Sequence, residues 1–217
     1  MAEKRKALIA YVVIFLALVT VWYLILYPKI ETLKGNYTVI FILLWFIGKT
    51  IIWIFPVFIY LRLIGIHNPL DFLKFKNNWV KGIGWGILLS LIWVALRVIL
   101  FCVVMGDKTI SFQIGAYLWI ATLVSGFFEE ISFRSVILQQ LSEQITFWKA
   151  NVISTIIFLA YHIPTWFVQG FPNLIPNCFS VIFLGLVWGY LFKKTKSIWT
   201  STIFHILHNL SVVIGIG

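Results

Sequence analysis

Two adjacent carboxylates and an arginine lie near the middle of this 217-residue chain, in a stretch otherwise apolar enough to cross a lipid bilayer. They are Glu129, Glu130 and Arg134. A charged side chain at the centre of a spanning helix is penalised by about 2.5 to 3.5 kcal/mol on insertion scales. Charges that are kept at membrane depth despite that penalty are candidates for a functional role.

Helix geometry assigns different roles to the two glutamates. Glu130 and Arg134 are four residues apart, so in a helix they lie within about 40° of each other and Arg134 can neutralise Glu130. Glu129 points about 100° away from Glu130. Glu129 is therefore the less compensated carboxylate and the candidate for a general base.

Two later segments place further polar groups on one helix face. Phe158 and His162 are four residues apart, and so are His205 and Asn209. Counting 1.5 Å per residue from the predicted cytoplasmic ends puts Glu129 at roughly 13 Å, His162 at roughly 18 Å, His205 at roughly 12 Å and Asn209 at roughly 18 Å. A single intramembrane His or Asn is often only a packing residue, but convergence at one depth predicts one polar site.

Three other polar residues of the predicted spans are left without a role: Lys49, Arg97 and His208. Arg97 can extend towards the outer surface. Lys49 lies near mid-span, where it could balance the carboxylates or bind a substrate charge. His208 is an additional candidate beside His205.

The composition is that of a protein with several membrane spans. Hydrophobic residues make up 61% of the chain and charged residues only 11%, too few to cover the surface of a soluble domain. The formal net charge of +10 comes from residues scattered between long apolar runs, without the basic patch that nucleic-acid binding requires. We expect membrane lipid as a partner and no nucleic acid.

Seven segments have about the length needed to span the hydrocarbon core: 8–27, 37–61, 82–105, 113–138, 150–168, 177–192 and 197–217. With a cytoplasmic N-terminus, eleven basic residues lie inside: Lys4, Arg5, Lys6, Arg62, Lys74, Lys76, Lys81, Lys149, Lys193, Lys194 and Lys196. Three lie outside: Lys29, Lys34 and Lys108. This distribution predicts an all-α, polytopic helical bundle with the N-terminus inside and the C-terminus outside.

The spans are expected to form one integral membrane domain, residues 1–217, with sequential helices antiparallel because most loops are short. The inside connection 62–81 is longer, and Asn68-Pro69 begins either a short interfacial helix or a solvated loop. Gly82 with Gly86, and Gly185 with Gly189, have the spacing of close helix contacts, although glycine is also common in spanning helices.

Three motifs in order, Glu129-Glu130-xxx-Arg134, Phe158-xxx-His162 and His205-xxx-Asn209, resemble those of the CPBP family, also called Abi proteins or type II CAAX prenyl endopeptidases. The resemblance covers about residues 113 to 217. Many members have Gly after the motif Arg, where this chain has Ser135. That difference could alter local packing, but it removes no chemical group.

The resemblance implies an intramembrane endopeptidase of the glutamic type, without a cofactor or metal. Glu129 would activate a water that His162 helps to hold, and His205 with Asn209 would stabilise the oxyanion. Glu130 and Arg134 would brace the site. The implied substrates are a prenylated C-terminal tail, a bacteriocin or signalling-peptide precursor, or a membrane protein, and the implied location is a bacterial cytoplasmic membrane.

Three alternatives remain open at this stage. Glu129, His162, His205 and His208 could bind zinc, although the His-Glu-x-x-His signature is absent from the sequence. The chain could instead be a non-catalytic scaffold or bacteriocin-immunity protein. A proton-coupled transporter is the third, and it would more often show repeated halves. The sequence leaves the substrate, the scissile bond and the oligomeric state open.

Overall fold

The computed structural model describes residues 2–104, 106, 110–171 and 173–216. Residues 105 and 217, which end two of the predicted spans, and Lys108 lie outside this part. Helices make up 82% of the structure, and the described residues contain no strand. The all-α bundle predicted from hydropathy is therefore confirmed.

Each of the seven predicted spans coincides with a helical run. The first run joins α1 (Ala2–Val21), η1 (Trp22–Leu26) and α2 (Tyr27–Glu31). The second joins α3 (Thr38–Lys49), η2 (Thr50–Ile54) and α4 (Phe55–Leu63). The third joins α6 (Trp79–Val98) and η3 (Ile99–Val104). The fourth joins α7 (Ala116–Glu130), η4 (Ile131–Leu138) and α8 (Gln139–Ser142). The last three are α9 (Phe147–Val168), α10 (Leu174–Thr195) and α11 (Ile198–Val213), and α5 (Pro69–Phe72) is a single turn. Here η marks a π-helical stretch.

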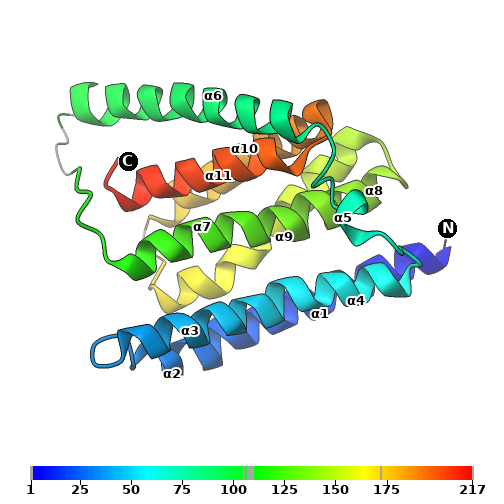
Figure 1. Cartoon of the computed structure of the whole chain (residues 1–217), viewed down its shortest axis with the longest axis horizontal. Helices are drawn as coiled ribbons and strands as arrows, with labels where there is room; N and C mark the ends of the chain where they lie inside the picture. The colour runs from blue at the N-terminus through cyan, green and yellow to red at the C-terminus, as the bar shows by residue number, and fades with distance from the viewer. Residues whose placement is uncertain (1, 105, 107–109, 172, 217) are drawn as a thin grey trace.

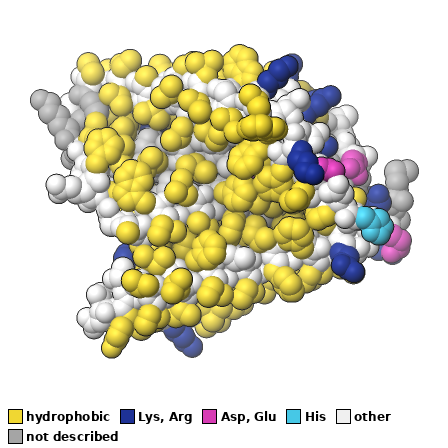
Figure 2. All heavy atoms as spheres, viewed as in Figure 1, with side chains coloured by type: hydrophobic (Ala, Val, Ile, Leu, Met, Phe, Trp, Pro, Cys, Tyr) yellow, Lys and Arg dark blue, Asp and Glu magenta, His cyan; other side chains and the backbone are white. Residues whose placement is uncertain are grey.

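Five of these runs are long and apolar enough to cross a membrane: 3–31, 38–63, 79–101, 147–168 and 174–195. The other two carry the polar motifs. The run containing α7 and η4 includes Glu129, Glu130 and Arg134, while α11 has 16 residues and ends at Val213, short of the predicted 197–217 span. Large apolar side chains cover much of the surface (Figure 2), as expected of a multi-pass membrane protein.

Consecutive long helices run antiparallel, in layers (Figure 1). Helix α6 forms one outer layer, α11 packs between α6 and α7, α10 packs against α9 and α11, and α1 with α3 and α4 forms the opposite side. Lys and Arg side chains gather at the end of the bundle that holds the N-terminus (Figure 2).

The glycine pairs lie at close helix contacts. A Cβ added to Gly82 would come within 2.8 Å of Ser197 Cβ, and one added to Gly86 within 2.9 Å of Ile203 Cβ, both at α11. A Cβ on Gly185 would come within 2.8 Å of Thr155 Cγ2 on α9. These glycines let α6 and α10 approach their neighbours closely, as the small-residue spacing predicts.

Gly82→Ala is expected to lower the free energy of unfolding by about 1 to 3 kcal/mol, because the new methyl group overpacks the contact with Ser197. Gly84→Ala, on the same helix, is the matched control: a Cβ there meets nothing within 4 Å. Its stability should stay the same or rise slightly, since alanine favours the helix. Thermal unfolding in detergent compares the two variants, and equal stabilities would contradict this account of the α6–α11 contact.

Candidate functional site

The charged triplet lies where the fourth helical run changes its hydrogen-bond register. Helix α7 ends at Glu130, and the π-helical stretch η4 begins at Ile131 and carries Arg134. All three charged side chains are buried, with exposures of 5% for Glu129, 0% for Glu130 and 2% for Arg134. π-Helical turns within α-helices are frequent at functional sites.

Glu130 is held by two cationic or potentially cationic groups. Arg134 Nε lies 3.4 Å from Glu130 Oε2, and His205 Nδ1 lies 3.0 Å from Glu130 Oε1. The Arg134 guanidinium also stands over the Phe158 ring, 4.6 Å from its centroid, and Nη2 donates to the Gly185 carbonyl. The Glu130–Arg134 pair predicted from the four-residue spacing is thus present in the structure, and an aromatic ring packs against it.

Glu129 has contacts that helix geometry alone does not reveal. The Tyr161 hydroxyl donates a hydrogen bond of 2.9 Å to Glu129 Oε1, and His205 Nε2 lies 3.7 Å from Glu129 Oε2. The sequence reasoning missed Tyr161. A hydroxyl inside an apolar span, directly before His162, was the signal available for it.

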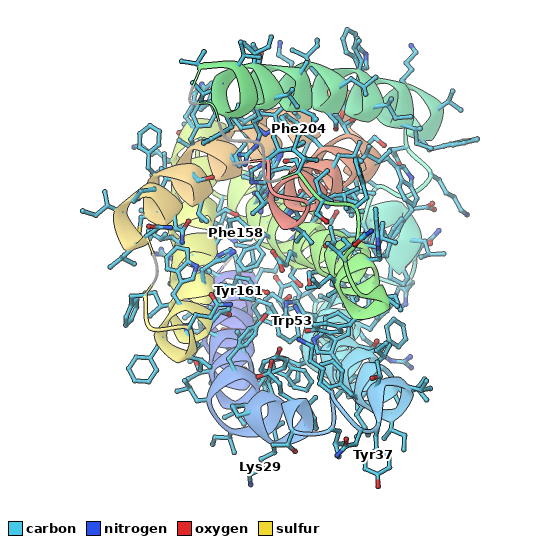
Figure 3. All side chains as sticks on the ribbon, turned by 90° about the vertical axis from the view of Figure 1, so that its left-hand side faces the viewer. Lys29, Tyr37, Trp53, Phe158, Tyr161 and Phe204 are labelled. Carbon is cyan, nitrogen blue, oxygen red and sulfur yellow. The ribbon has the colours of Figure 1, made fainter. Side chains whose placement is uncertain are left out.

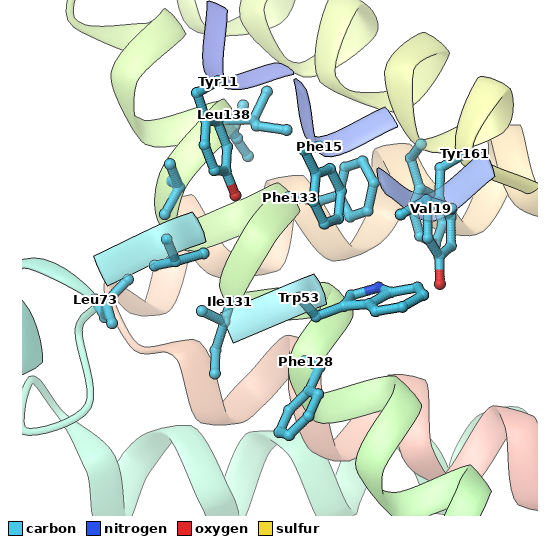
Figure 4. Packing of buried hydrophobic residues seen from close by; sticks show 14 of the residues in the cluster. Tyr11, Phe15, Val19, Trp53, Leu73, Phe128, Ile131, Phe133, Leu138 and Tyr161 are labelled. Atoms are coloured by element: carbon cyan, nitrogen blue, oxygen red, sulfur yellow. The ribbon is translucent and has the colours of Figure 1, made fainter. Parts of the chain in front are cut away.

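The aromatic residues around Tyr161 fix its position. Its ring stacks on Phe15 of α1 at a centroid distance of 6.2 Å, and it meets Phe133 at 5.2 Å and Trp53 at 5.9 Å (Figure 4). Viewed along the bundle, Phe158, Tyr161 and Trp53 follow one another through its interior (Figure 3). The Glu129 contact therefore depends on helices α1, α9 and η2 as well as on α7.

His205 lies between the two glutamates and touches both, as the distances above show. Its ring stacks on Trp188 of α10, with centroids 3.9 Å apart and planes inclined by 19°. Because a carboxylate only accepts, the contact with Glu130 places a proton on His205 Nδ1. His205 thereby links α11 to the charged residues of α7 and to the wall formed by α10.

His162 presents an acceptor nitrogen. Its Nδ1 lies 2.7 Å from the Phe158 carbonyl, which can only accept, so Nδ1 carries the proton and Nε2 has the free lone pair. The ring lies against Phe158, at 4.6 Å, and Tyr161, at 4.9 Å. Phe158 also meets His205 at 6.0 Å, so the second motif packs beside the third.

His208 carries its ring proton on the other nitrogen. Trp93 Nε1, which can only donate, lies 3.0 Å from His208 Nδ1. His208 Nδ1 is therefore the acceptor, and Nε2 carries the ring proton. The sequence had left His208 without a role, and the Trp93 partner on α6 could not be inferred from it.

A cavity of about 590 Å³ adjoins these residues. His162, His208 and Asn209 line it, together with Arg97 and with Ser125, which lies one turn before Glu129 on α7. Two histidines and two carboxamides, those of Asn177 and Asn209, thus line the cavity, while Glu129 and Glu130 are not among its lining residues. Asn209, the last predicted site residue, contributes to its wall.

Lys49 and Arg97, which the sequence left unassigned, occupy different places. Arg97 Nε and Nη2 both donate to the Ile216 carbonyl, at the end of the chain segment that follows α11. Lys49 is only 1% exposed, its Nζ lies 3.2 Å from Ser125 Oγ, and the Trp53 ring centroid lies 4.0 Å away. Lys49 of α3 is therefore a buried lysine that contacts α7 at Ser125, one turn before Glu129.

One chain of contacts joins Tyr161, Glu129, His205, Glu130 and Arg134. Within the described part of the chain, no three His, Cys, Asp or Glu side chains are grouped so that they could hold a metal ion. His205 Nδ1 is occupied by Glu130, and His208 Nδ1 by Trp93.

The fold and the site define a class: a multi-pass helical membrane protein with two buried glutamates, of which one is paired with arginine and both contact one histidine. Residues 111–211 match the family model described as "Type II CAAX prenyl endopeptidase Rce1-like". The resemblance predicted from the three motifs is thereby confirmed over this segment, which holds every predicted site residue.

One curated relative supports the same conclusion. The chain is 28% identical over 95 residues to "Putative membrane peptidase YdiL" of Bacillus subtilis (strain 168). The alignment covers 44% of this chain and 35% of the relative, so the chain spans about a third of the length of the curated relative it matches. No solved structure gives a significant match.

Proposed function

We propose that the chain is an intramembrane endopeptidase that hydrolyses a peptide bond of a membrane-associated substrate with a water activated by Glu129. The observation that carries the proposal is the unequal pairing of two adjacent buried carboxylates. Glu130 faces Arg134 at 3.4 Å, whereas Glu129 receives only a neutral hydroxyl and the more distant His205 Nε2. A carboxylate without a permanent counter-charge is the better base.

The other residues suit the steps that amide hydrolysis requires. His162 Nε2 can accept a hydrogen bond from the attacking water, which helps to orient it. Donors are needed for the oxyanion of the tetrahedral intermediate, and Asn209 and His208, whose Nε2 carries the ring proton, both line the cavity. His205, between the glutamates, would hold their geometry and stabilise the negative charge.

The proposed substrates are those implied by the family: a prenylated C-terminal tail, a bacteriocin or signalling-peptide precursor, or a membrane protein. A bacterial cytoplasmic membrane is the proposed location, with residues 1–217 acting as one domain. The cavity of about 590 Å³ has room for a few residues of an extended peptide but not for a folded domain. A substrate segment would therefore enter in an unfolded form.

The test compares the membrane proteomes of cells that express the wild-type chain and Glu129→Ala, with new N- and C-termini identified by mass spectrometry. Precursors should accumulate, and their cleavage products should disappear, in the variant. Identical termini in both strains would favour the scaffold alternative. Activity of the purified protein that is lost to a strong chelator and restored by zinc alone would favour the zinc-dependent alternative.

Tyr161→Phe is expected to lower turnover about 10- to 100-fold while the protein stays folded. The substitution removes only the hydroxyl that donates to Glu129 Oε1, and hydrogen bonds to charged groups contribute about 1.5 to 3 kcal/mol. The ring contacts with Phe15 and Phe133 remain. Tyr11→Phe, in another buried tyrosine of the same cluster, is the control and should turn over as the wild type does. An equal loss in both variants would mean that packing, not the Glu129 contact, is responsible.

A further inference from the structure

A second cavity lies at the basic end of the bundle, away from the glutamates. It has a volume of about 350 Å³. Three lysines line it, Lys74, Lys193 and Lys196, and so do the polar side chains of Asn77, Gln139 and Ser142. Its apolar lining includes the buried residues Leu138 and Phe192. The cavity therefore combines concentrated positive charge with an apolar floor.

The three lysines are not neutralised within the protein. In the part of the chain that the structure describes, none of the ion pairs within 4.0 Å involves Lys74, Lys193 or Lys196. Asp71, an acidic residue close to Lys74 in sequence, lies 3.9 Å from Lys76 instead. Lys193 Nζ stands over the Phe147 ring, 4.0 Å from its centroid. Three like charges around one cavity favour an anion.

Two of the lysines occupy backbone conformations that do not suit them. Lys74 has a φ of 63° and Lys196 a φ of 53°, in the left-handed region where glycine or asparagine would be less strained. They are two of the five described non-glycine residues with positive φ. Lys196 is the C-cap of α10, and Lys74 follows the C-cap Leu73 of α5, so both conformations end a helix, where a left-handed residue is common.

The surroundings of Lys74 are fixed by an unusual set of hydrogen bonds. Four consecutive carbonyls, those of residues 72 to 75, accept bonds from residues of η4, α8 and α11. The donors are Gln139 Nε2 at 3.0 Å, Ser135 Oγ at 2.9 Å, the Ile198 amide at 3.5 Å and Trp199 Nε1 at 2.8 Å. Asn68-Pro69 thus begins a short helix, the single turn α5, as one of the two sequence alternatives expected, and the connection after it packs against the ends of η4 and α11.

Ser135 is the residue at which the sequence departs from many members of the family it resembles. Its hydroxyl donates to the Leu73 carbonyl, directly before Lys74. The departure therefore helps to hold the backbone of one cavity lysine.

The location of the cavity identifies the source of the anion. Lys193 and Lys196 lie at the end of α10, one of the helices long and apolar enough to cross a membrane, so they are at the level of the lipid headgroups. Basic cavities between spanning helices at this level suit the phosphate of an anionic lipid.

We propose that the cavity formed by Lys74, Lys193 and Lys196 binds the phosphate headgroup of an anionic phospholipid. The bound headgroup would bridge the end of α10 and the connection after α5. Because the carbonyls of this connection accept hydrogen bonds from η4 and α11, the lipid would also stabilise these two helices. This binding does not require the chain to be a peptidase.

The test uses the detergent-purified full chain, titrated with short-chain phosphatidylglycerol, phosphatidylcholine or inorganic phosphate at constant ionic strength. Each lysine near an anionic headgroup contributes about fivefold in affinity, so the triple variant Lys74→Gln, Lys193→Gln, Lys196→Gln should bind phosphatidylglycerol about 100-fold more weakly. The matched control is Lys81→Gln, Lys149→Gln, Lys194→Gln, which removes the same charge at the same end from exposed residues outside the cavity. It should bind nearly as the wild type does.

Equal losses in the two triple variants would show a diffuse charge effect and overturn the proposal. Free phosphate that displaces phosphatidylglycerol at millimolar concentration would overturn the lipid as the source. If the triple variant fails to fold, the neighbouring single variants decide: Lys193→Gln should weaken binding about fivefold, and Lys194→Gln should not. Equal affinities of these two variants would also refute the proposal.

Discussion

Glu129→Gln is expected to lower turnover by about 10² to 10⁴ while the chain still folds and inserts, because it removes the proposed base and keeps the shape of the side chain. The Tyr161 hydroxyl, which donates to Glu129 Oε1 at 2.9 Å, can donate equally to an amide oxygen. Arg134 keeps its counter-charge in this variant, since it pairs with Glu130. The measurement is kcat/KM for a peptide substrate, with thermal stability recorded in the same detergent.

Glu143→Gln is the matched control for this substitution. Glu143 follows α8, is exposed, and carries the same carboxyl group outside the buried site. Its replacement should leave kcat/KM unchanged. Near wild-type turnover in Glu129→Gln, or failure of that variant to fold, would remove Glu129 as the base and reverse the roles given to the two glutamates.

The sequence predicted the elements and the convergence of the polar residues because these depend on local patterns. Hydropathy located all seven helical runs, and four-residue spacing predicted the Glu130–Arg134 contact. Counting 1.5 Å per residue predicted that His205 lies at the same membrane depth as Glu129. In the structure His205 lies between the two glutamates.

The sequence could not predict which of many similar side chains contact the site. Aromatic residues make up 18% of the chain, so nothing local distinguishes Trp188 from residues that face lipid. The π-helical stretch after Glu130 is a change of hydrogen-bond register that hydrophobic periodicity does not encode. The carbonyls buried after α5 depend on donors more than 60 residues away, such as Ser135.

Because the site is buried, each of its charges needs a counter-charge or hydrogen-bond partner within the protein. Glu130 is fully buried and is contacted by Arg134 and His205, while the Arg134 guanidinium faces the Phe158 and Trp188 rings. Water cannot replace a missing partner in such surroundings. Glu130 is therefore expected to contribute chiefly to stability, and Glu129 chiefly to chemistry.

Glu130→Gln is accordingly expected to lower the free energy of unfolding by about 3 to 5 kcal/mol, because it leaves Arg134 buried without its counter-charge. The control is the double variant Glu130→Gln, Arg134→Met, which removes both charges and should recover part of the loss, since replacing a buried pair with neutral groups is often tolerated. Thermal or denaturant unfolding in detergent measures all three proteins. If Glu130→Gln is as stable as the wild type, or if the double variant is less stable than the single one, the 3.4 Å contact does not hold the site together.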